Sequence, residues 1–271
     1  MLFSDHLVLI RGGGDLATGV VYRLHQAGFP VIVTELARPL AVRRTVAAAA
    51  AVLEGRIQIE NLRVQLAHTP EEALELAYTN TVPVLVSPQL PYLPISQSPN
   101  LPILIDARIA KRNIDTRIDQ ASLVIGLGPG FTAGVDCHAV IETMRGHTLG
   151  RVIWRGAALP DTGTPGIVAG KGAERVLRAP AAGIVNWRLE IGDYVKEGDL
   201  IGDVAGEPVI APFAGALRGL IAPGSAVPAG YKIGDLDARG RRDACFTISD
   251  KALSIGGGAL EAILTYLNKN S

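Results

Sequence analysis

The sequence predicts an α/β fold, in which a doubly wound parallel sheet is followed by a small all-β domain and a C-terminal helix. Over residues 6–155, short apolar runs alternate with helical stretches, and the apolar runs show no polar alternation. Such runs are typical of parallel strands that are covered on both faces. Beyond residue 172, glycine and proline become frequent, and helical periodicity is lost until the last stretch, 251–267.

The elements and domain boundaries follow from these changes along the chain. The predicted strands of the first domain span 7–10, 31–34, 57–59, 82–87, 103–106, 123–126 and 152–154, and its predicted helices span 15–27, 42–53, 71–78 and 135–145. A stretch over 88–102 that is rich in Pro, Ser and Asn predicts a surface loop. We expect a parallel-sheet domain over 1–156, a linker over 157–172, a β domain over 173–240 and a C-terminal segment with a helix over 241–271.

The overall composition narrows the classes of partner and compartment. The 271 residues carry 26 Lys plus Arg and 26 Asp plus Glu, so the formal net charge is zero. This balance gives no support to nucleic acid or an anionic membrane surface as the main partner. Two distant cysteines indicate a reducing compartment, and their spacing to histidines predicts no metal site. We see no signal-peptide pattern and no apolar run of roughly 18 residues, so we expect a cytoplasmic protein.

The strongest candidate binding site is the glycine-rich turn Gly12-Gly13-Gly14-Asp15-Leu16-Ala17. It follows a predicted strand, opens an amphipathic helix and fits the pattern G-x-G-x-x-A, which is typical of dinucleotide-binding turns. Gly12 would form the tight turn, Gly14 would let a phosphate approach, and Ala17 would let the helix sit close to the strand. Free N–H groups at a helix start favour an anion. We therefore predict Gly12, Gly13, Gly14, Asp15 and Ala17 as cofactor contacts in a Rossmann-like nucleotide-binding domain.

A carboxylate at the end of the second predicted strand extends this site. Glu35 lies 21 residues after Gly14, where an acidic residue usually accepts hydrogen bonds from ribose hydroxyls. A carboxylate there disfavours a 2′-phosphate, but nearby arginines could offset it, so the choice between NAD and NADP stays open. The competing interpretation is a turn that only packs a helix on a strand, with Glu35 as a solvated strand end.

Two further segments are expected at the same rim of the sheet. The second glycine-rich turn, over 126–134, also follows a predicted strand, and we predict Gly128, Gly130 and Thr132 as cofactor contacts. A purely structural turn is the alternative. A segment that leaves the strand 103–106 contributes three more predicted contacts, which are Asp106, Arg108 and Lys111. Arg and Lys there could hold phosphate or carboxylate, and a solvated charged loop is an equally good interpretation.

Cys137 is the candidate reactive residue. It falls in the first turn of the helix predicted over 135–145, and a helix N-terminus lowers the pKa of a thiol. In that position it could carry sulfur or selenium. We favour the alternative that Cys137 is buried and inert.

The region after residue 172 contains an internal repeat with a 32-residue offset. Ala179-Pro180-x-x-Gly183 with Gly192, Val195, Gly198 and Ile201-Gly202-Asp203 recurs as Ala211-Pro212-x-x-Gly215 with Gly224, Val227, Gly230 and Ile233-Gly234-Asp235. Each copy is too small to bury a core alone, so the two copies are expected to pack together with pseudo-two-fold symmetry. The repeat resembles the barrel-sandwich hybrid of biotinyl and lipoyl carrier domains. The stretch 204–210 between the copies has no lysine, so we expect neither biotin nor lipoate and interpret the domain as a docking or lid module.

Several long motifs carry a resemblance to a known family. They are Arg11-Gly-Gly-Gly-Asp-Leu-Ala-Thr-Gly19, Asp106-Ala-Arg-Ile-Ala-Lys-Arg-Asn113, Gly126-Leu-Gly-Pro-Gly-Phe-Thr-Ala-Gly-Val-Asp-Cys-His138 and Cys245-Phe-Thr-Ile-Ser-Asp-Lys251. Over nearly its full length the chain resembles the YqeB-type proteins of the selenium-dependent molybdenum hydroxylase system. These are related to the XdhC/CoxI-like accessory factors of xanthine and carbon monoxide dehydrogenases. The resemblance implies a factor that helps load or sulfurate the molybdenum cofactor, with a pyranopterin phosphate, its nucleotide form or a separate nucleotide in the Rossmann-like unit.

Three functions follow from these observations. The resemblance favours a non-catalytic accessory or maturation factor, whose partners would be a molybdenum hydroxylase apoenzyme or cofactor-maturation proteins, and a homo-oligomer is common among such factors. The first alternative is an NAD(P)-dependent oxidoreductase, for which the sequence offers no clear proton-transfer pair. The second alternative is a non-catalytic scaffold that senses a nucleotide.

Overall fold

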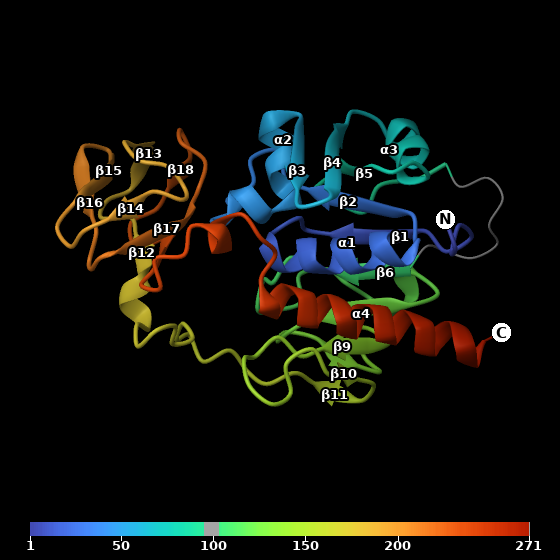
Figure 1. Cartoon of the computed structure of the whole chain (residues 1–271). Helices are drawn as coiled ribbons and strands as arrows, with labels where there is room; N and C mark the ends of the chain where they lie inside the picture. Colours follow the sequence, from blue (N-terminus) through green and yellow to red (C-terminus); the bar gives the residue numbers. More distant parts are fainter. Residues whose placement is uncertain (95–102, 271) are drawn as a thin grey trace. The chain divides into compact units, whose positions relative to one another are not determined.

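The structure is a computed structural model that describes residues 1–94 and 103–270. It is a mixed α/β fold with one large, mostly parallel sheet, smaller antiparallel sheets and a C-terminal helix (Figure 1). The chain divides into two compact units. The larger unit comprises residues 1–39, 48–162 and the segment from 248 onward, and the smaller unit comprises 40–47 and 163–247. Residues 95–102 of the loop predicted over 88–102 lie outside the described residues.

The larger unit is built on a nine-stranded sheet. In sheet order its strands are β10 (Val152–Ile153), β9 (Ala139–Ile141), β7 (Val124–Leu127), β6 (Ile103–Asp106), β1 (Val8–Arg11), β2 (Val31–Glu35), β5 (Val82–Val86), β4 (Leu62–Ala67) and β3 (Arg56–Ile59). The seven strands from β9 to β4 run parallel, and β3 and β10 pair antiparallel at the two edges. The short strands β8 (Thr132–Ala133) and β11 (Gly156–Ala157) form a separate antiparallel pair.

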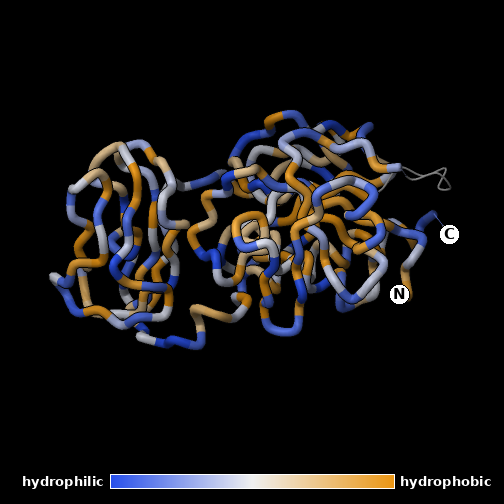
Figure 2. The backbone as a smooth tube through the Cα atoms, turned by 90° about the horizontal axis from the view of Figure 1, so that it is seen from above, coloured by the Kyte–Doolittle hydropathy of each residue, from blue (hydrophilic) through white to orange (hydrophobic). Residues whose placement is uncertain are grey.

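The central strands explain why the sequence forms this sheet. All residues of β1, β6 and β7 are buried, which accounts for their continuous apolar runs. Figure 2 shows hydrophobic segments (orange) in the interior of the larger unit, as the burial of these strands requires. From β1 the chain passes through α1 (Asp15–Ala27) to β2 on one side, whereas β6 lies on the other side of β1. The direction of the strand order therefore reverses at β1, and ligands of such sheets bind outside the carboxyl ends of the strands at this point.

The described residues also contain four α-helices, which are α1, α2 (Ala51–Glu54), α3 (Pro70–Ala77) and α4 (Asp250–Lys269). The start of α3 is as predicted, with Pro70 in its first turn and the Thr69 hydroxyl accepting a hydrogen bond from the Glu72 N–H at 3.1 Å. Ser249 caps α4 in the same way, through the N–H of Ala252. None of these helices combines the length and apolar character that crossing a bilayer requires.

The helix predicted over 42–53 is wrong. The chain instead forms two 3₁₀ turns, η1 (Arg44–Val46) and η2 (Ala48–Ala50), before the single turn of α2. The reason is that backbone groups of this segment bond outside it. The N–H of Ala48 donates to the Thr18 hydroxyl at 2.9 Å, and the N–H of Ala49 donates to the Gly13 carbonyl at 2.8 Å. The apolar residues of this segment have helical periodicity, but its backbone N–H groups bond to α1 and to the turn before it instead of to the segment's own carbonyls.

The helix predicted over 135–145 is also wrong. The N–H groups of Val135 and Asp136 both donate to the carbonyl of Thr132, which closes a turn instead of opening a helix. The next residues, Ala139–Ile141, form β9 and are fully buried beside β7. A short apolar run cannot be assigned to helix or strand from periodicity alone. Here the run pairs with β7 and extends the parallel sheet by one strand.

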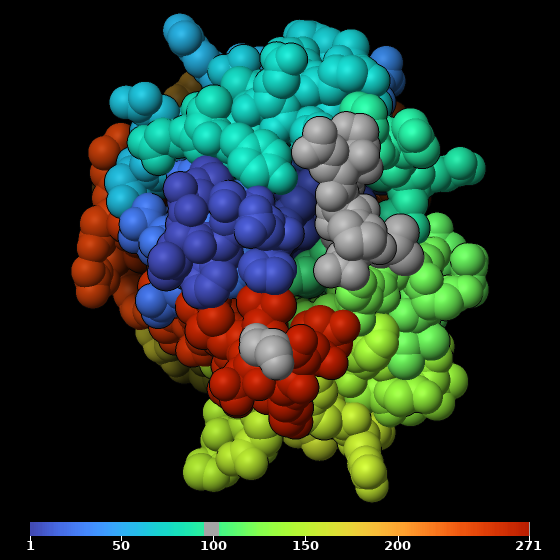
Figure 3. All heavy atoms as spheres, turned by 90° about the vertical axis from the view of Figure 1, so that its right-hand side faces the viewer, coloured from blue at the N-terminus to red at the C-terminus, as the bar shows by residue number. Residues whose placement is uncertain are grey.

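Helices α1 and α4 pack closely in the larger unit. A Cβ atom on Gly19 would collide with the backbone of Ala252, and one on Gly256 would collide with the carbonyl of Gly19. These glycines therefore let the two backbones approach more closely than side chains would allow. On the face shown in Figure 3, the end of α4 (red) lies beside the N-terminal segment (dark blue).

The smaller unit contains two four-stranded antiparallel sheets, with strand orders β12-β19-β17-β14 and β16-β15-β13-β18. Their strands are β12 (Val176–Arg178), β13 (Gly183–Trp187), β14 (Tyr194–Val195), β15 (Leu200–Val204), β16 (Glu207–Ile210), β17 (Gly215–Leu220), β18 (Ala226–Val227) and β19 (Lys232–Asp237). Each sheet takes its two central strands from one copy of the repeat, one edge strand from the other copy, and its second edge strand, β12 or β16, from the residues directly before that other copy. Buried residues of both sheets form one core cluster, which confirms that the two copies pack together.

Candidate functional site

The candidate site lies at the carboxyl ends of the parallel strands of the larger unit. Because β1, β2, β6, β7 and β9 run parallel, the segments that follow them emerge at one edge of the sheet. The turn Gly12–Gly14 follows β1, and the loop that begins at Ala107 follows β6, its neighbour. These two segments therefore meet where the strand order reverses.

The three glycines of the first turn have different structural roles. Gly12 has a positive φ of 91°, and a Cβ atom there would lie 3.0 Å from the Cα atom of Arg108. A Cβ atom on Gly13 would lie 2.8 Å from the backbone nitrogen of Ala49. Gly14, in contrast, has a φ of −63° and no heavy atom within 4 Å of the position of a Cβ atom. Packing therefore explains Gly12 and Gly13 but not Gly14.

Gly14 is also the N-cap of α1, and no side chain caps this helix start. The first N–H groups of a helix have no partner within the helix, and they make its start a favourable place for an anion. Asp15 is the first helical residue, and Ala17 is fully buried.

Glu35 is held firmly beside the turn. One carboxylate oxygen accepts a hydrogen bond from the N–H of Gly13 at 2.8 Å, and the other accepts one from the N–H of Leu36 at 2.7 Å. A carboxylate oxygen has capacity for more than one donor, so these bonds leave acceptor capacity on Glu35. The carboxylate thus fixes the turn and remains able to accept hydroxyl groups.

A charged network, which the sequence did not reveal, joins the ends of β1 and β6. Arg11 is buried and donates two hydrogen bonds to the carboxylate of Asp115, at 2.7 and 2.9 Å. Arg108 bonds the same carboxylate at 2.7 Å, and it also pairs with the buried Asp106 at 2.5 Å. The hydroxyl of Thr116 donates to Asp106 at 2.5 Å. Two arginines and two aspartates therefore balance each other in charge at this point of the sheet.

This network bears on three residues that the sequence predicted as cofactor contacts. Asp106 and Arg108 are bonded to each other, so their charges already have protein partners. Lys111 pairs with Asp161 at 2.8 Å. The structure thus brings Asp106 and Arg108 to the predicted edge, where they position the loop, and contact with a ligand stays a prediction for all three.

The network makes acid stability depend on Asp115. Hydrogen bonds from Arg11, and then from Arg108, lower the pKa of Asp115 from 3.8 to about 2. A carboxylate with a lowered pKa stabilises the fold above its unfolded pKa, and this contribution is lost as the pH falls through the folded pKa. We therefore expect Asp115→Asn to flatten the loss of stability between pH 3.8 and about 2 in acid-unfolding curves. The change should be modest because Asp115 is half-exposed, and identical curves for both proteins would contradict the pairing.

In the second glycine-rich turn, the glycines and several backbone N–H groups already contact other parts of the protein. Cβ atoms on Gly126, Gly128 and Gly130 would collide with Phe131, with Thr143 and with the backbone of Arg112, respectively. The N–H of Gly128 donates to the carbonyl of Ile141 at 2.9 Å, and the N–H of Thr132 donates to the Asp136 carboxylate at 2.8 Å. Packing and internal bonds thus explain this turn, so the alternative of a structural turn accounts for Gly128, Gly130 and Thr132 here.

Cys137 does not lie at a helix start, so the reason for expecting a lowered pKa is wrong. The residue lies between β8 and β9 and is fully buried. Burial raises the pKa of the Cys137 thiol to about 12. A protonated, inaccessible thiol is a poor nucleophile. The structure therefore favours the inert interpretation, and a role in carrying sulfur or selenium stays a prediction.

Lys251, the second residue of α4, is a candidate site residue that the sequence did not predict. Burial lowers the pKa of Lys251, and the charge of Arg145 lowers it further, whereas Asp15, Glu142 and Asp250 act in the opposite direction. The next residue, Ala252, packs against Gly19 of α1, so Lys251 comes from a part of α4 that lies close to α1. In the sequence, Ser249 is a residue type that favours the start of a helix. The residues around it do not indicate which part of the sheet this helix would approach.

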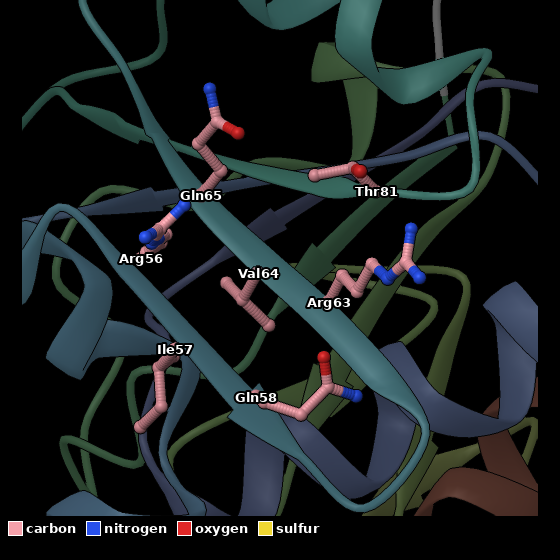
Figure 4. Close-up of a pocket in the computed structure, with 7 residues that line it drawn as sticks. All are labelled: Arg56, Ile57, Gln58, Arg63, Val64, Gln65 and Thr81. Carbon is pink, nitrogen blue, oxygen red and sulfur yellow. The ribbon is translucent and has the colours of Figure 1, made fainter.

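A depression of about 580 Å³ lies elsewhere, on the edge strand β3 and its neighbour β4. Figure 4 shows its lining, which comes from β3, from β4 and from one residue before β5: Arg56, Ile57, Gln58, Arg63, Val64, Gln65 and Thr81. These residues lie within β3 and β4 or directly before β5, and not at the carboxyl ends of the parallel strands. Within residues 1–94 and 103–270, no cluster of His, Cys, Asp and Glu is arranged to hold a metal ion.

No family model matches the chain. Two solved structures are similar only over small parts: an aspartoacylase family protein from Mesorhizobium loti (TM-score 0.22, 19% identity, 24% of this chain and 23% of that chain) and a succinylglutamate desuccinylase/aspartoacylase from Rhodobacter sphaeroides (TM-score 0.21, 22% identity, 24% and 23%). Likeness at this level carries no argument about fold or function.

One curated protein is similar over almost the whole chain. It is the uncharacterized protein YqeB of Escherichia coli strain K12, which is 47% identical over 268 residues, covering 98% of this chain and 49% of that protein. The chain thus spans about half the length of this relative. The similarity supports the assignment to YqeB-type proteins that the motifs predicted.

Proposed function

We propose that the larger unit binds a phosphate-bearing, nucleotide-like ligand at the start of α1, and that the chain acts as an accessory or maturation factor for a selenium-dependent molybdenum hydroxylase. The observation that carries the binding proposal is Gly14. Its backbone conformation suits any residue, and a Cβ atom there would point into open space. A glycine is nevertheless present at an uncapped helix start, as expected where a phosphate approaches the backbone.

The neighbours of Gly14 support the same ligand class. Glu35 is fixed by two backbone N–H groups and keeps acceptor capacity for the hydroxyls of a ribose or a comparable sugar. Lys251 supplies a partly buried cation close to α1, since the next residue, Ala252, packs against Gly19 of that helix. A phosphate bound there would meet a helix dipole and a positive side chain together. Reversal of the strand order at β1 supports the finer description of this unit as Rossmann-like.

The link to molybdenum hydroxylases rests on the motifs and on the resemblance to YqeB-type proteins. The ligand would then be a pyranopterin cofactor, its nucleotide form or a separate nucleotide. The partners would be a hydroxylase apoenzyme or other maturation proteins. The smaller unit, whose repeat resembles the barrel-sandwich hybrid, would serve as a docking module without biotin or lipoate. The alternatives remain an NAD(P)-dependent oxidoreductase and a nucleotide-sensing scaffold.

Binding is tested by titration calorimetry with NAD, NADP, ADP and CTP, using the wild-type protein and Gly14→Val. We expect at least one of these nucleotides to bind the wild type. Gly14→Val should weaken it by about 100-fold or more, because the side chain occupies the space of the phosphate and displaces its hydrogen bonds. The melting temperature should stay close to that of the wild type, since no protein atom lies near the new Cβ atom.

The matched control is Gly257→Ala, which also adds a Cβ atom into open space but lies in the middle of α4. It should bind the nucleotide like the wild type. Equal binding by Gly14→Val and the wild type would overturn the proposed site. Binding of NAD or NADP with exclusion of the other nucleotides would favour the oxidoreductase alternative.

A further inference from the structure

The larger unit has an open edge along β3. This strand is the last of the nine-stranded sheet, and within the part of the chain that the structure describes no segment pairs with its outer side. The depression of about 580 Å³ lies on β3 and its neighbour β4. An unpaired strand edge exposes backbone N–H and C=O groups, which can pair with a strand of another chain. The edge and the depression therefore offer both backbone partners and room for an extended segment.

The register of β3 on β4 determines which backbone groups point outward. The carbonyl of Gly55 accepts a hydrogen bond from the N–H of Leu66 at 2.7 Å, directly before the first pair of the ladder. Bonded and non-bonded pairs alternate along an antiparallel ladder, so Arg56 and Gln58 occupy non-bonded positions. The backbone N–H and C=O groups of these two residues therefore point away from β4, toward the open edge.

One face of this strand pair carries only hydrogen-bond donors with long or polar side chains. Residues that lie opposite each other share a face, and Arg56 lies opposite Gln65, while Gln58 lies opposite Arg63. Thr81, which precedes β5, lines the same depression (Figure 4). Guanidinium, amide and hydroxyl groups of three neighbouring strands are thus available beside the edge.

The two arginines of this face have no acidic partner. No Asp or Glu is among the described residues that line the depression. Neither the guanidinium of Arg56 nor that of Arg63 makes a hydrogen bond or ion pair with any residue in the described ranges. Elsewhere on the surface arginines do pair, as Arg117 does with Asp119 at 3.1 Å. Arg56 and Arg63 are diagonal neighbours, which places their backbones about 7–8 Å apart and their like charges close together.

These charges select among the possible occupants of the edge. A second copy of this chain, paired edge to edge, would bring the arginines of both copies together, and like charges across strands are destabilising. The zero net charge of the chain gives no support to nucleic acid. An acidic segment, in contrast, complements the two guanidinium groups. The competing interpretation is that the arginines only protect the edge from unwanted pairing.

We propose that the open edge of β3 and the depression beside it bind an extended acidic segment of a partner protein as an added strand. The backbone of the segment pairs with Arg56 and Gln58, and carboxylates at every second residue lie on the face of the two arginines. Charge-assisted hydrogen bonds to the guanidinium groups then add to the backbone bonds. This inference does not depend on the proposed nucleotide site, because none of these residues takes part in it.

The first test measures binding of labelled peptides to the wild-type protein by fluorescence polarisation. The acidic peptide is Thr-Glu-Val-Glu-Val-Glu-Thr, which places carboxylates on one face of a strand. One control peptide has Gln in place of each Glu, and another keeps the carboxylates but carries methyl groups on its backbone nitrogens. We expect the acidic peptide to bind, and both controls to bind about tenfold more weakly or worse, because each lacks one of the two interactions.

The second test changes the charges of the protein. Arg56→Gln combined with Arg63→Gln should weaken the acidic peptide about tenfold, because two charge pairs are lost. Arg151→Gln combined with Arg155→Gln removes two charges from exposed positions of the same unit, and it should bind like the wild type. Raising the salt concentration should weaken binding to the wild type and to this control, and have less effect on the first variant.

The third test changes the edge itself. Gln58→Pro removes an N–H group that points to solvent, which an edge strand tolerates, and Gln58→Thr keeps it. Both substitutions lose the bond from the Gln58 amide to the carbonyl of Glu60, at 2.8 Å, so they are matched. Gln58→Pro should bind the acidic peptide about tenfold more weakly than Gln58→Thr. The melting temperatures of the two variants show whether both are folded, and the methylated peptide tests the same bonds without any substitution.

Four results would overturn the proposal. The first is the absence of saturable binding of the acidic peptide to the wild type up to about 1 mM, which would leave the arginines with a protective role only. The second is equal binding of the acidic and methylated peptides. The third is tighter binding of an oligothymidylate than of the acidic peptide at the same arginines. The fourth is a dimer of the wild type in light scattering that Gln58→Pro converts to a monomer, since the occupant would then be a second copy.

Discussion

Replacing Gly256 by valine should lower the free energy of unfolding of the larger unit by about 3 kcal/mol or more. The reason is the close approach of α1 and α4, where a Cβ atom at this position would collide with the carbonyl of Gly19. Neither backbone can yield without separating the two helices. The loss is measured by urea unfolding, followed through the fluorescence of Trp154 in a background that carries Trp187→Phe.

The neighbouring residue provides the control. A Cβ atom on Gly257 would meet nothing within 4 Å, although the residue belongs to the same helix. Gly257→Ala should therefore raise stability by about 1 kcal/mol through helix propensity. If the two substitutions changed stability equally, close packing of α1 on α4 would not be the reason for the glycines.

Asp106→Leu should destabilise the larger unit by about 3 kcal/mol or more, because breaking a buried ion pair leaves its partners uncompensated. Asp106 is fully buried and accepts hydrogen bonds from Arg108 and Thr116. Its loss leaves the buried Arg11 and the nearby Arg108 to share Asp115 alone. Thermal and urea unfolding of the purified variant provide the measurement.

A surface pair serves as the comparison for Asp106. Asp119 pairs with Arg117 at 3.1 Å, and both side chains are largely exposed. Asp119→Ala should cost less than about 1 kcal/mol, as is usual for exposed ion pairs. A similar loss for both variants would show that the network at the ends of β1 and β6 adds nothing beyond ordinary surface pairing.

The sequence predicted the elements whose signals are local. Helices α1 and α3 and the buried strands β1, β2 and β6 were found within one residue at each end, because apolar runs, Thr69 and Pro70 mark them directly. The repeat likewise predicted two packed copies in the smaller unit. These features depend on neighbouring residues or on comparison of the chain with itself.

The errors fall where distant residues decide the structure. The segment 42–53 looked helical, but Thr18 and Gly13 take its backbone N–H groups. The run at 139–141 joined β7 as a strand and left Cys137 buried. In the candidate site, the position of Glu35 beside the turn Gly12–Gly14 could be predicted from spacing, and ligand contact stays a prediction. The pairing of Arg11 with Asp115 spans 104 residues and could not.

We propose that the start of α1 holds the phosphate group of a nucleotide-like ligand. Mass spectrometry of small molecules released from protein purified without added nucleotide tests it most directly, when the wild type and Gly14→Val are compared. We predict that a phosphate-containing ligand is released from the wild type and is absent from Gly14→Val, while both proteins melt at similar temperatures. Release of the same ligand in equal amounts from both proteins would contradict the claim.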